Sequence, residues 1–340
     1  MRSFPLLFLA TATIVIGSLA CAAEPRVDLE VITEAGFIGT DARAWSEMLT
    51  KAGFSSVRIK SGANESPSMQ SIGTTAVPAY HVVGVVTAAN QLLLPKGRFG
   101  INDRNKIETW LRKLREGGED AINIKPTAFG LLPKQLVAVH EALAIPVQGS
   151  TLGQPPRETA KKIADRLTYK FTSDEVAQRA LAQGEPIADE LENISSGTAL
   201  AAILRPLGLI MFPEKNGPDI RLRIASSRDA KEHWPVGWPL KGNPAETLPE
   251  LFKFLKVNIG DAPLSEALTA IAGRVKAPLL LDHNSLARAR TDLSTKVSLA
   301  ETNIFYSRAL DRLLSQAKLK YEIRLDEADK PFLWVTTVQR

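Results

Sequence analysis

Residues 260–281 read GDAPLSEALTAIAGRVKAPLLL, and this stretch decides the fold of the chain's last quarter. Leu264, Leu268, Ile271 and Val275 recur at helical spacing, so Pro263 to Val275 is predicted to form a helix with one apolar stripe. Pro278 then opens an apolar run through Leu281 that is typical of a short buried strand. A helix followed directly by a buried strand indicates a small α/β unit.

The residues on either side complete this unit. A strand is predicted at 255–259 before the helix, an alternating strand at 295–299 after it, a second helix at 304–318, and a closing hairpin from strands at 321–325 and 332–336. The expected module at 250–340 therefore has the order βαββαββ.

An echo of the module lies at residues 145–225. At an offset of 108 residues Pro155 matches Pro263 and Asp174 matches Asp282, and at an offset of 110 Leu200 matches Leu310. Most matches are apolar positions of the expected helices, so the repeat predicts a second copy of the same architecture. The shift of two residues falls in the variable middle of the repeat, where a loop insertion is expected.

The later copy resembles the short N-terminal domain of secretins and TonB-dependent receptors. The similarity rests on PLSEAL at 263–268, ALDRLL at 309–314 and LKY at 319–321, and the earlier copy matches more weakly. The resemblance implies a compact periplasmic α/β module that makes protein contacts and has no catalytic residues. Residue Arg340 follows the module directly, so neither a secretin ring nor a receptor barrel is expected in this sequence.

The remaining segments divide the chain further. Residues 24–118 predict an N-terminal open-sheet sandwich with the order strand, helix, strand, hairpin, helix, and residues 61–78 are expected to be a polar loop. A connecting segment with one helix is expected at 119–144. Residues 226–249 are interpreted as a Trp/Pro linker with too many prolines for a helix or a strand.

The first 22 residues are typical of an export signal. Arg2 precedes an apolar run from Leu6 to Leu19, and small residues at 20 and 22 fit cleavage after Ala22. Cys21 is the chain's one cysteine, and with Ser18-Leu19-Ala20 it partly matches a bacterial lipoprotein box. Its lipidation, and hence a lipid tether to a membrane, is one possibility; removal with the signal is the other. A periplasmic or outer-envelope location is expected.

Composition narrows the function only coarsely. The chain has 340 residues, is 44% hydrophobic and 23% charged, and carries a net charge of +5, which loss of Arg2 with the signal would reduce to +4. These values are those of a folded globular protein. For an exported chain they favour an anionic envelope surface over nucleic acid as a partner. No later stretch reaches the roughly 20 apolar residues of a membrane span.

The linker holds the most unusual local feature, Trp234 and Trp238, each followed by a proline. Packing of both rings into the seam between the two copies is the favoured interpretation. The alternative is that the two rings stack on a sugar or a peptide, which would suit a sugar- or peptidoglycan-binding protein or an envelope hydrolase.

Motifs for catalysis, metals and cofactors are weak. His81, His140, His233 and His283 do not have zinc-site spacing, and Asp282-His283 is interpreted mainly as a polar loop start, with a ligand role as the alternative. Lys60-Ser61-Gly62 and the SxxK at 315–318 have the wrong order for a penicillin-binding enzyme. No catalytic residue, metal or cofactor is therefore predicted. The expected function is that of a non-enzymatic protein-interaction adaptor.

Overall fold

The computed structural model describes residues 24–37, 41–62, 65–74, 77–217 and 219–338. The expected signal segment and Cys21 lie outside these residues. Contacts divide the chain into two compact units, one ending at Asn123 and the other beginning at Ile124. Both units contain helices and strands, which confirms the mixed α/β class predicted from the sequence.

Unit 1 is one sheet with two helices. Its central strand β1 pairs in parallel with β2 on one side and with β4 on the other, and β4 continues through the antiparallel strands β5 and β6. A further strand, β3, pairs with β4. The elements are β1 (Arg26–Thr33), α1 (Asp41–Lys51), β2 (Ser56–Ser61), β3 (Ser68–Ser71), β4 (Ala79–Val86), β5 (Gln91–Leu94), β6 (Gly97–Gly100) and α2 (Arg104–Asn123).

Both helices of unit 1 cover the same face of the sheet. Strand β1 alternates, so that Val27, Leu29 and Val31 point into a core that also contains Trp45 of α1 and Leu111 of α2. The opposite face of the strand carries charged residues, and an ion pair joins it to β2. This arrangement agrees with the predicted open sheet with helices on one side.

Three details of unit 1 differ from the prediction. Strand β3 lies within the segment 61–78 that was predicted to be only a loop, and β6 was missed because its four residues include two glycines. Helix α2 extends to Asn123, past the expected end of the module at 118, and Gly118, with φ +64°, interrupts it there. Glycine tolerates a positive φ, so the chain kinks at Gly118 between two helical stretches.

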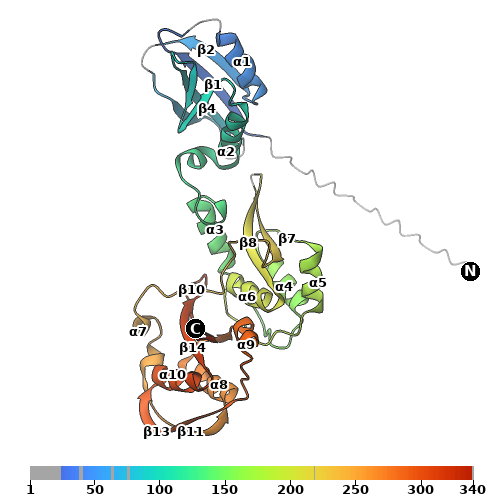
Figure 1. Cartoon of the computed structure of the whole chain (residues 1–340), viewed down its shortest axis with the longest axis vertical. Coiled ribbons are helices and arrows are strands. Elements are labelled where there is room, and N and C mark those ends of the chain that lie inside the picture. Colours follow the sequence, from blue (N-terminus) through green and yellow to red (C-terminus); the bar gives the residue numbers. More distant parts are fainter. Residues whose placement is uncertain (1–23, 38–40, 63–64, 75–76, 218, 339–340) are drawn as a thin grey trace, which may run out of the picture. The chain divides into compact units, whose positions relative to one another are not determined.

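Copy 2, in unit 2, has the order of elements predicted for residues 250–340. Its helices α8 and α10 lie between a two-stranded ribbon of β11 and β13 and a sheet of order β10-β14-β15-β12 (Figure 1). An additional short helix, α9, was not predicted. The elements are β11 (Phe254–Pro263), α8 (Leu264–Val275), β12 (Leu279–Leu281), α9 (His283–Ala289), β13 (Lys296–Phe305), α10 (Tyr306–Gln316), β14 (Leu319–Leu325) and β15 (Pro331–Thr337).

Copy 1 repeats most of this topology. Its sheet has the order β7-β9-β8, with β7 parallel to β9 and β8 antiparallel to it, as β12, β15 and β14 are in copy 2. Asp174 caps α5 as Asp282 caps α9, 108 residues later. The elements are α4 (Pro156–Ala164), β7 (Phe171–Ser173), α5 (Glu175–Gln183), α6 (Ser196–Leu204), β8 (Leu209–Asn216) and β9 (Asp219–Ser226), preceded by α3 (Pro133–Leu143).

The two-stranded ribbon of copy 2 is reduced in copy 1, contrary to the prediction of a full βαββαββ order at 145–225. One bridge, Pro146 with Ser195, remains where β11 and β13 pair in copy 2. The Val147 N–H still donates to the Ile194 carbonyl at 2.8 Å, and the Gly153 N–H donates to the Ile187 carbonyl at 2.7 Å. Prolines lack the N–H that a strand ladder needs, and the glycines of this segment adopt positive φ, so a regular ribbon does not form.

The linker also contains regular elements, which corrects the prediction that it has none. Strand β10 (Trp238–Pro239) pairs with β14 at the edge of the copy 2 sheet, and α7 (Pro244–Thr247) follows with Asn243 as its cap. An edge strand tolerates proline because one side of it needs no N–H donor. Within the described residues, no helix is long and apolar enough to cross a membrane.

Candidate functional site

Trp234 lies at the seam between the two copies, as predicted. Its side chain is 1% exposed, and its indole N–H donates to Glu327 Oε1 at 2.5 Å. The ring stacks on Phe129 with 6.0 Å between ring centroids and meets Trp238 edge-on at 5.4 Å. Burial of the ring and use of its N–H leave Trp234 unable to stack on a ligand.

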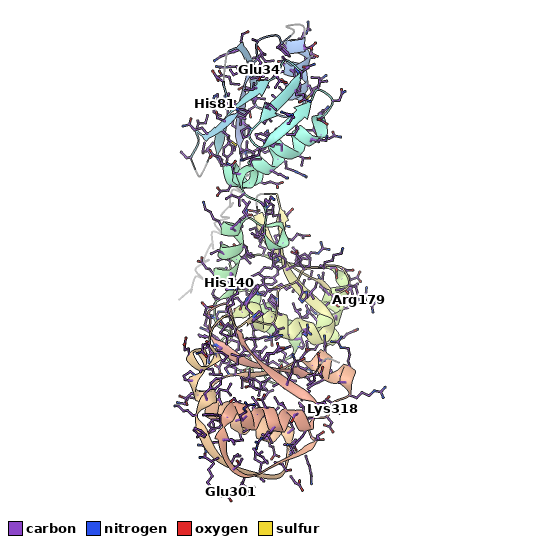
Figure 2. The ribbon with its side chains drawn as sticks, turned by 60° about the vertical axis from the view of Figure 1, so that its left-hand side comes forward. Glu34, His81, His140, Arg179, Glu301 and Lys318 are labelled. Atoms are coloured by element: carbon purple, nitrogen blue, oxygen red, sulfur yellow. The ribbon has the colours of Figure 1, made fainter. Side chains whose placement is uncertain are left out.

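Trp238 is only half-buried. It packs beside Trp234 and His140 of α3, with 5.6 Å between the His140 and Trp238 ring centroids. Figure 2 marks His140 on this helix. The indole nitrogen of Trp238 is buried and has no hydrogen-bond partner among the described residues. The seam interpretation therefore holds fully for Trp234 and in part for Trp238, which has less area to lose on truncation.

Two neighbouring carboxylates in the turn between β14 and β15 cap the buried start of α6. Asp326 Oδ2 accepts the Ser195 N–H at 2.9 Å, and Glu327 Oε2 accepts the Thr198 N–H at 3.1 Å and its hydroxyl at 2.9 Å. The first N–H groups of a helix have no partner inside the helix, and acidic groups satisfy them best. Copy 2 thereby completes a helix of copy 1.

Glu327 is enclosed on every side. Its side chain is 5% exposed, and Gly197 lies so close that a Cβ there would clash with Glu327 Oε1 and come 2.8 Å from Trp234 Nε1. Burial raises the pKa of Glu327 to about 7, although the hydrogen bonds from Trp234 and Thr198 act in the opposite direction. The carboxyl is therefore partly protonated near neutral pH, and the protonated carboxyl can donate a hydrogen bond to the Thr198 hydroxyl.

A second polar connection joins the copies around Asp282. This buried carboxylate caps α9, accepts the Ser285 hydroxyl at 2.6 Å and receives Arg205 through two hydrogen bonds of 3.0 and 3.2 Å. Burial opposes ionisation of Asp282, but the bonds from Arg205 and Ser285 outweigh it and lower its pKa. The paired, capped carboxylate holds α9 of copy 2 against the end of α6 in copy 1.

His283 is the first residue of α9, so the loop predicted at this position is in fact a helix start. Its Nε2 lies 2.9 Å from Asp189 Oδ2 of copy 1. The hydrogen bond with Asp189 raises the pKa of His283, while partial burial acts against it. Because the Ser285 hydroxyl bonds to Asp282 and the imidazole faces Asp189, these residues do not align as a nucleophile and its base.

Metal and enzyme motifs find no further support. Across the described residues, no group of three or more His, Cys, Asp or Glu side chains could hold a metal ion. Lys60 pairs with Glu30 in unit 1, whereas the Ser315 hydroxyl donates to a carbonyl of its own helix in unit 2. The two motif fragments thus lie in different units, each with its own local partner.

A groove in copy 1 is a further candidate binding site, and it was not predicted from the sequence. It has a volume of about 540 Å³ and lies between α4, α5 and β7. We call it the copy 1 groove. Its floor is apolar and its rim carries three exposed cations. The floor residues are Ala160, Leu167, Tyr169, Phe171, Leu181 and Ile224, and the rim cations are Arg157, Lys161 and Lys170.

The groove cations are exposed and, within the described part of the chain, have no carboxylate partner. Among the described residues, none of these three forms an ion pair, and Asp165 is the carboxylate that lines the same groove. Arg179 on α5, by contrast, points to the surface and pairs with Glu175 at 3.1 Å (Figure 2). Burial raises the pKa of Tyr169, so its phenol stays neutral and keeps its donor.

Comparisons of the chain with protein-family models, with characterised proteins and with solved structures found no match.

Proposed function

We propose that the chain is an exported cell-envelope adaptor that binds a partner protein without catalysing a reaction. Support for export comes from the sequence of the first 22 residues. Support for an interaction role comes from the resemblance of residues 255–336 to the short N-terminal domain of secretins and TonB-dependent receptors, and from the topology of the three-stranded sheet that both copies share.

The observation that carries the proposal is the contrast between the seam and the copy 1 groove. At the seam, three ionisable groups already have hydrogen-bond partners within the chain. Asp282 bonds to Arg205 and His283 bonds to Asp189. Glu327 accepts hydrogen bonds from Trp234 and Thr198. The groove instead presents apolar surface and unpaired charge to solvent. A double module that exposes apolar surface and unpaired charges in one groove is suited to binding a partner protein there.

The sugar-binding and hydrolase alternative loses its main support. It rested on two indoles free to stack, and Trp234 is 1% exposed with its N–H already bonded. It also rested on the polar loop at 61–78, part of which forms strand β3 inside a sheet.

The test is affinity capture from the envelope fraction of the source cells. The bait is residues 23–340 with a C-terminal tag, and the control is an unrelated exported protein with the same tag. We expect enrichment of one or a few envelope proteins that elute as salt is raised, because exposed charges are screened by salt. Capture equal to that of the control would refute the adaptor proposal, and measurable turnover of an envelope polymer would favour the hydrolase alternative.

Export is tested separately on the protein made in its own cells. Mass spectrometry of its first peptide is expected to show a chain that starts near residue 23, or at a lipidated Cys21. A mature cellular protein that retains Met1 would refute export.

A further inference from the structure

The cations at the copy 1 groove are arranged along one edge. Arg157 and Lys161 are four residues apart, so they lie on the same face of α4, and Lys170 directly precedes β7. All three side chains are exposed, and each lines the same hollow as the apolar floor. A ligand over the floor would therefore meet positive charge along the rim.

The copy 1 groove adjoins a second hollow. This second hollow, of about 450 Å³, shares Thr168, Tyr169 and Lys170 with the groove and extends to Asp219 and Arg221 on β9. A peptide advances about 3.3 Å per residue when extended. Two adjoining hollows accommodate several residues of an extended chain, with one large side chain over the floor.

The rim is a property of copy 1 alone. At the repeat offset of 108 residues, Arg157 corresponds to Ser265, Lys161 to Thr269 and Lys170 to Pro278. Tyr169 corresponds to Ala277. The core positions match between the two copies, but the three cations of copy 1 correspond to uncharged residues in copy 2. The architecture of the module therefore does not require the cations.

We infer that the copy 1 groove binds an acidic peptide segment with a large apolar side chain, and that the partner of the proposed adaptor supplies it. This inference rests on the proposed function and names the chemistry of its partner. The carboxylates of the segment pair with Arg157, Lys161 and Lys170, and its apolar side chain covers Leu167 and Phe171. The Tyr169 side chain also lines the groove, and its hydroxyl is available to bond to the peptide backbone, whereas the Gln178 amide already donates to the Ser173 carbonyl and hydroxyl at 3.4 Å each.

The test measures binding of synthetic peptides to residues 23–340 by fluorescence anisotropy. The probe is a labelled peptide of about eight residues with a central phenylalanine flanked by aspartates, a length matched to the two hollows at about 3.3 Å per residue. Two further peptides replace the phenylalanine by glycine or the aspartates by asparagines. We expect binding of the first peptide, weaker binding of the other two, and a loss of affinity as salt rises.

Charge reversal identifies the surface. The variant with Arg157→Glu, Lys161→Glu and Lys170→Glu is expected to bind about tenfold more weakly or worse, since three exposed ion pairs are replaced by repulsion. The matched control is Lys162→Glu, which reverses an exposed charge on the same helix but does not line the groove. Thermal melts of both variants establish that each is folded, and a Lys161→Gln, Lys170→Gln variant gives an intermediate loss.

Several results would overturn the inference. These are equal binding of all three peptides, equal binding by the reversed and control variants, or binding only to phosphatidylglycerol vesicles, which would assign the cations to a membrane. If envelope capture succeeds and is unchanged by the triple reversal, the inference fails while the adaptor proposal stands. If the wild-type chain captures nothing, the adaptor proposal fails as well.

Discussion

Replacing Glu327 by glutamine removes a buried proton-binding group from the seam and should change how stability depends on pH. The pKa of Glu327 rises from 4.5 to about 7 on folding, because burial disfavours its charged form. The folded state therefore binds a proton more tightly than the unfolded state does. The stabilisation this provides is fully present below pH 4.5 and is lost as pH rises through about 7.

The size of the effect follows from the pKa difference. Each pKa unit corresponds to about 1.4 kcal/mol, so the wild-type free energy of unfolding should fall by about 3 kcal/mol across this window from Glu327 alone. The glutamine side chain of the variant keeps an oxygen for the Trp234 N–H and can donate to the Thr198 hydroxyl, but the Thr198 N–H loses its acceptor. We therefore expect Glu327→Gln to lack this part of the pH dependence, so that its stability relative to wild type rises as pH rises through about 7.

Urea unfolding at half-unit steps from pH 4 to pH 9, followed by tryptophan fluorescence, measures the effect. Glu301→Gln serves as the control because Glu301 is an exposed carboxylate that pairs with Lys256 on the ribbon. The pH reasoning is refuted if Glu327→Gln and wild type have parallel stability profiles, or if the variant loses stability relative to wild type as pH rises through about 7.

Three further predictions concern the seam. Trp234→Ala should lower the free energy of unfolding by about 3–5 kcal/mol, as for other buried aromatic residues; a loss below about 1 kcal/mol by urea unfolding would mean that the ring is exposed in solution. Gly197→Ala should cost about 1–3 kcal/mol, because its methyl group would clash with the buried carboxylate, whereas Gly273→Ala on open α8 should be neutral or stabilising in the same assay. Asp189→Asn should lower the pKa of His283 in an NMR titration, because the hydrogen bond with Asp189 holds that pKa above 6.5. In the wild type, this pair stabilises the fold fully below pH 6.5, and the contribution is lost as pH rises through the folded pKa of His283. An unchanged titration midpoint of His283 in the variant would contradict the pairing.

Much of copy 2 could be predicted from the sequence because its signals are local. The apolar stripe on α8 and the alternation of its strands are set by neighbouring residues, and the chain follows them. The weaker copy was predicted less well, because Pro146 lacks the N–H of the corresponding Phe254, and Gly149 and Gly153 adopt positive φ in the segment that corresponds to β11.

The seam contacts could be predicted only in outline. Trp234 was expected to be buried between the copies, but its carboxylate partner lies 93 residues away in a turn whose Asp-Glu-Ala-Asp sequence is typical of any exposed loop. One signal was available: α6 begins with small residues and no acidic group in its first turn, so its buried N–H groups needed an acceptor from elsewhere. The copy 1 groove had no such signal, since its walls come from segments between 157 and 224.

Site-specific photo-crosslinking in intact cells tests the central claim most directly, namely that the chain holds a partner in the copy 1 groove. A benzophenone amino acid is placed at Gln178 in the groove, and in a control at the exposed Ala300 on the ribbon of copy 2. We predict a crosslink from position 178 to one envelope protein, lost on charge reversal at Arg157, Lys161 and Lys170 and absent from position 300. Equal crosslinking from both positions, or none from position 178 in cells where affinity capture succeeds, would contradict the claim.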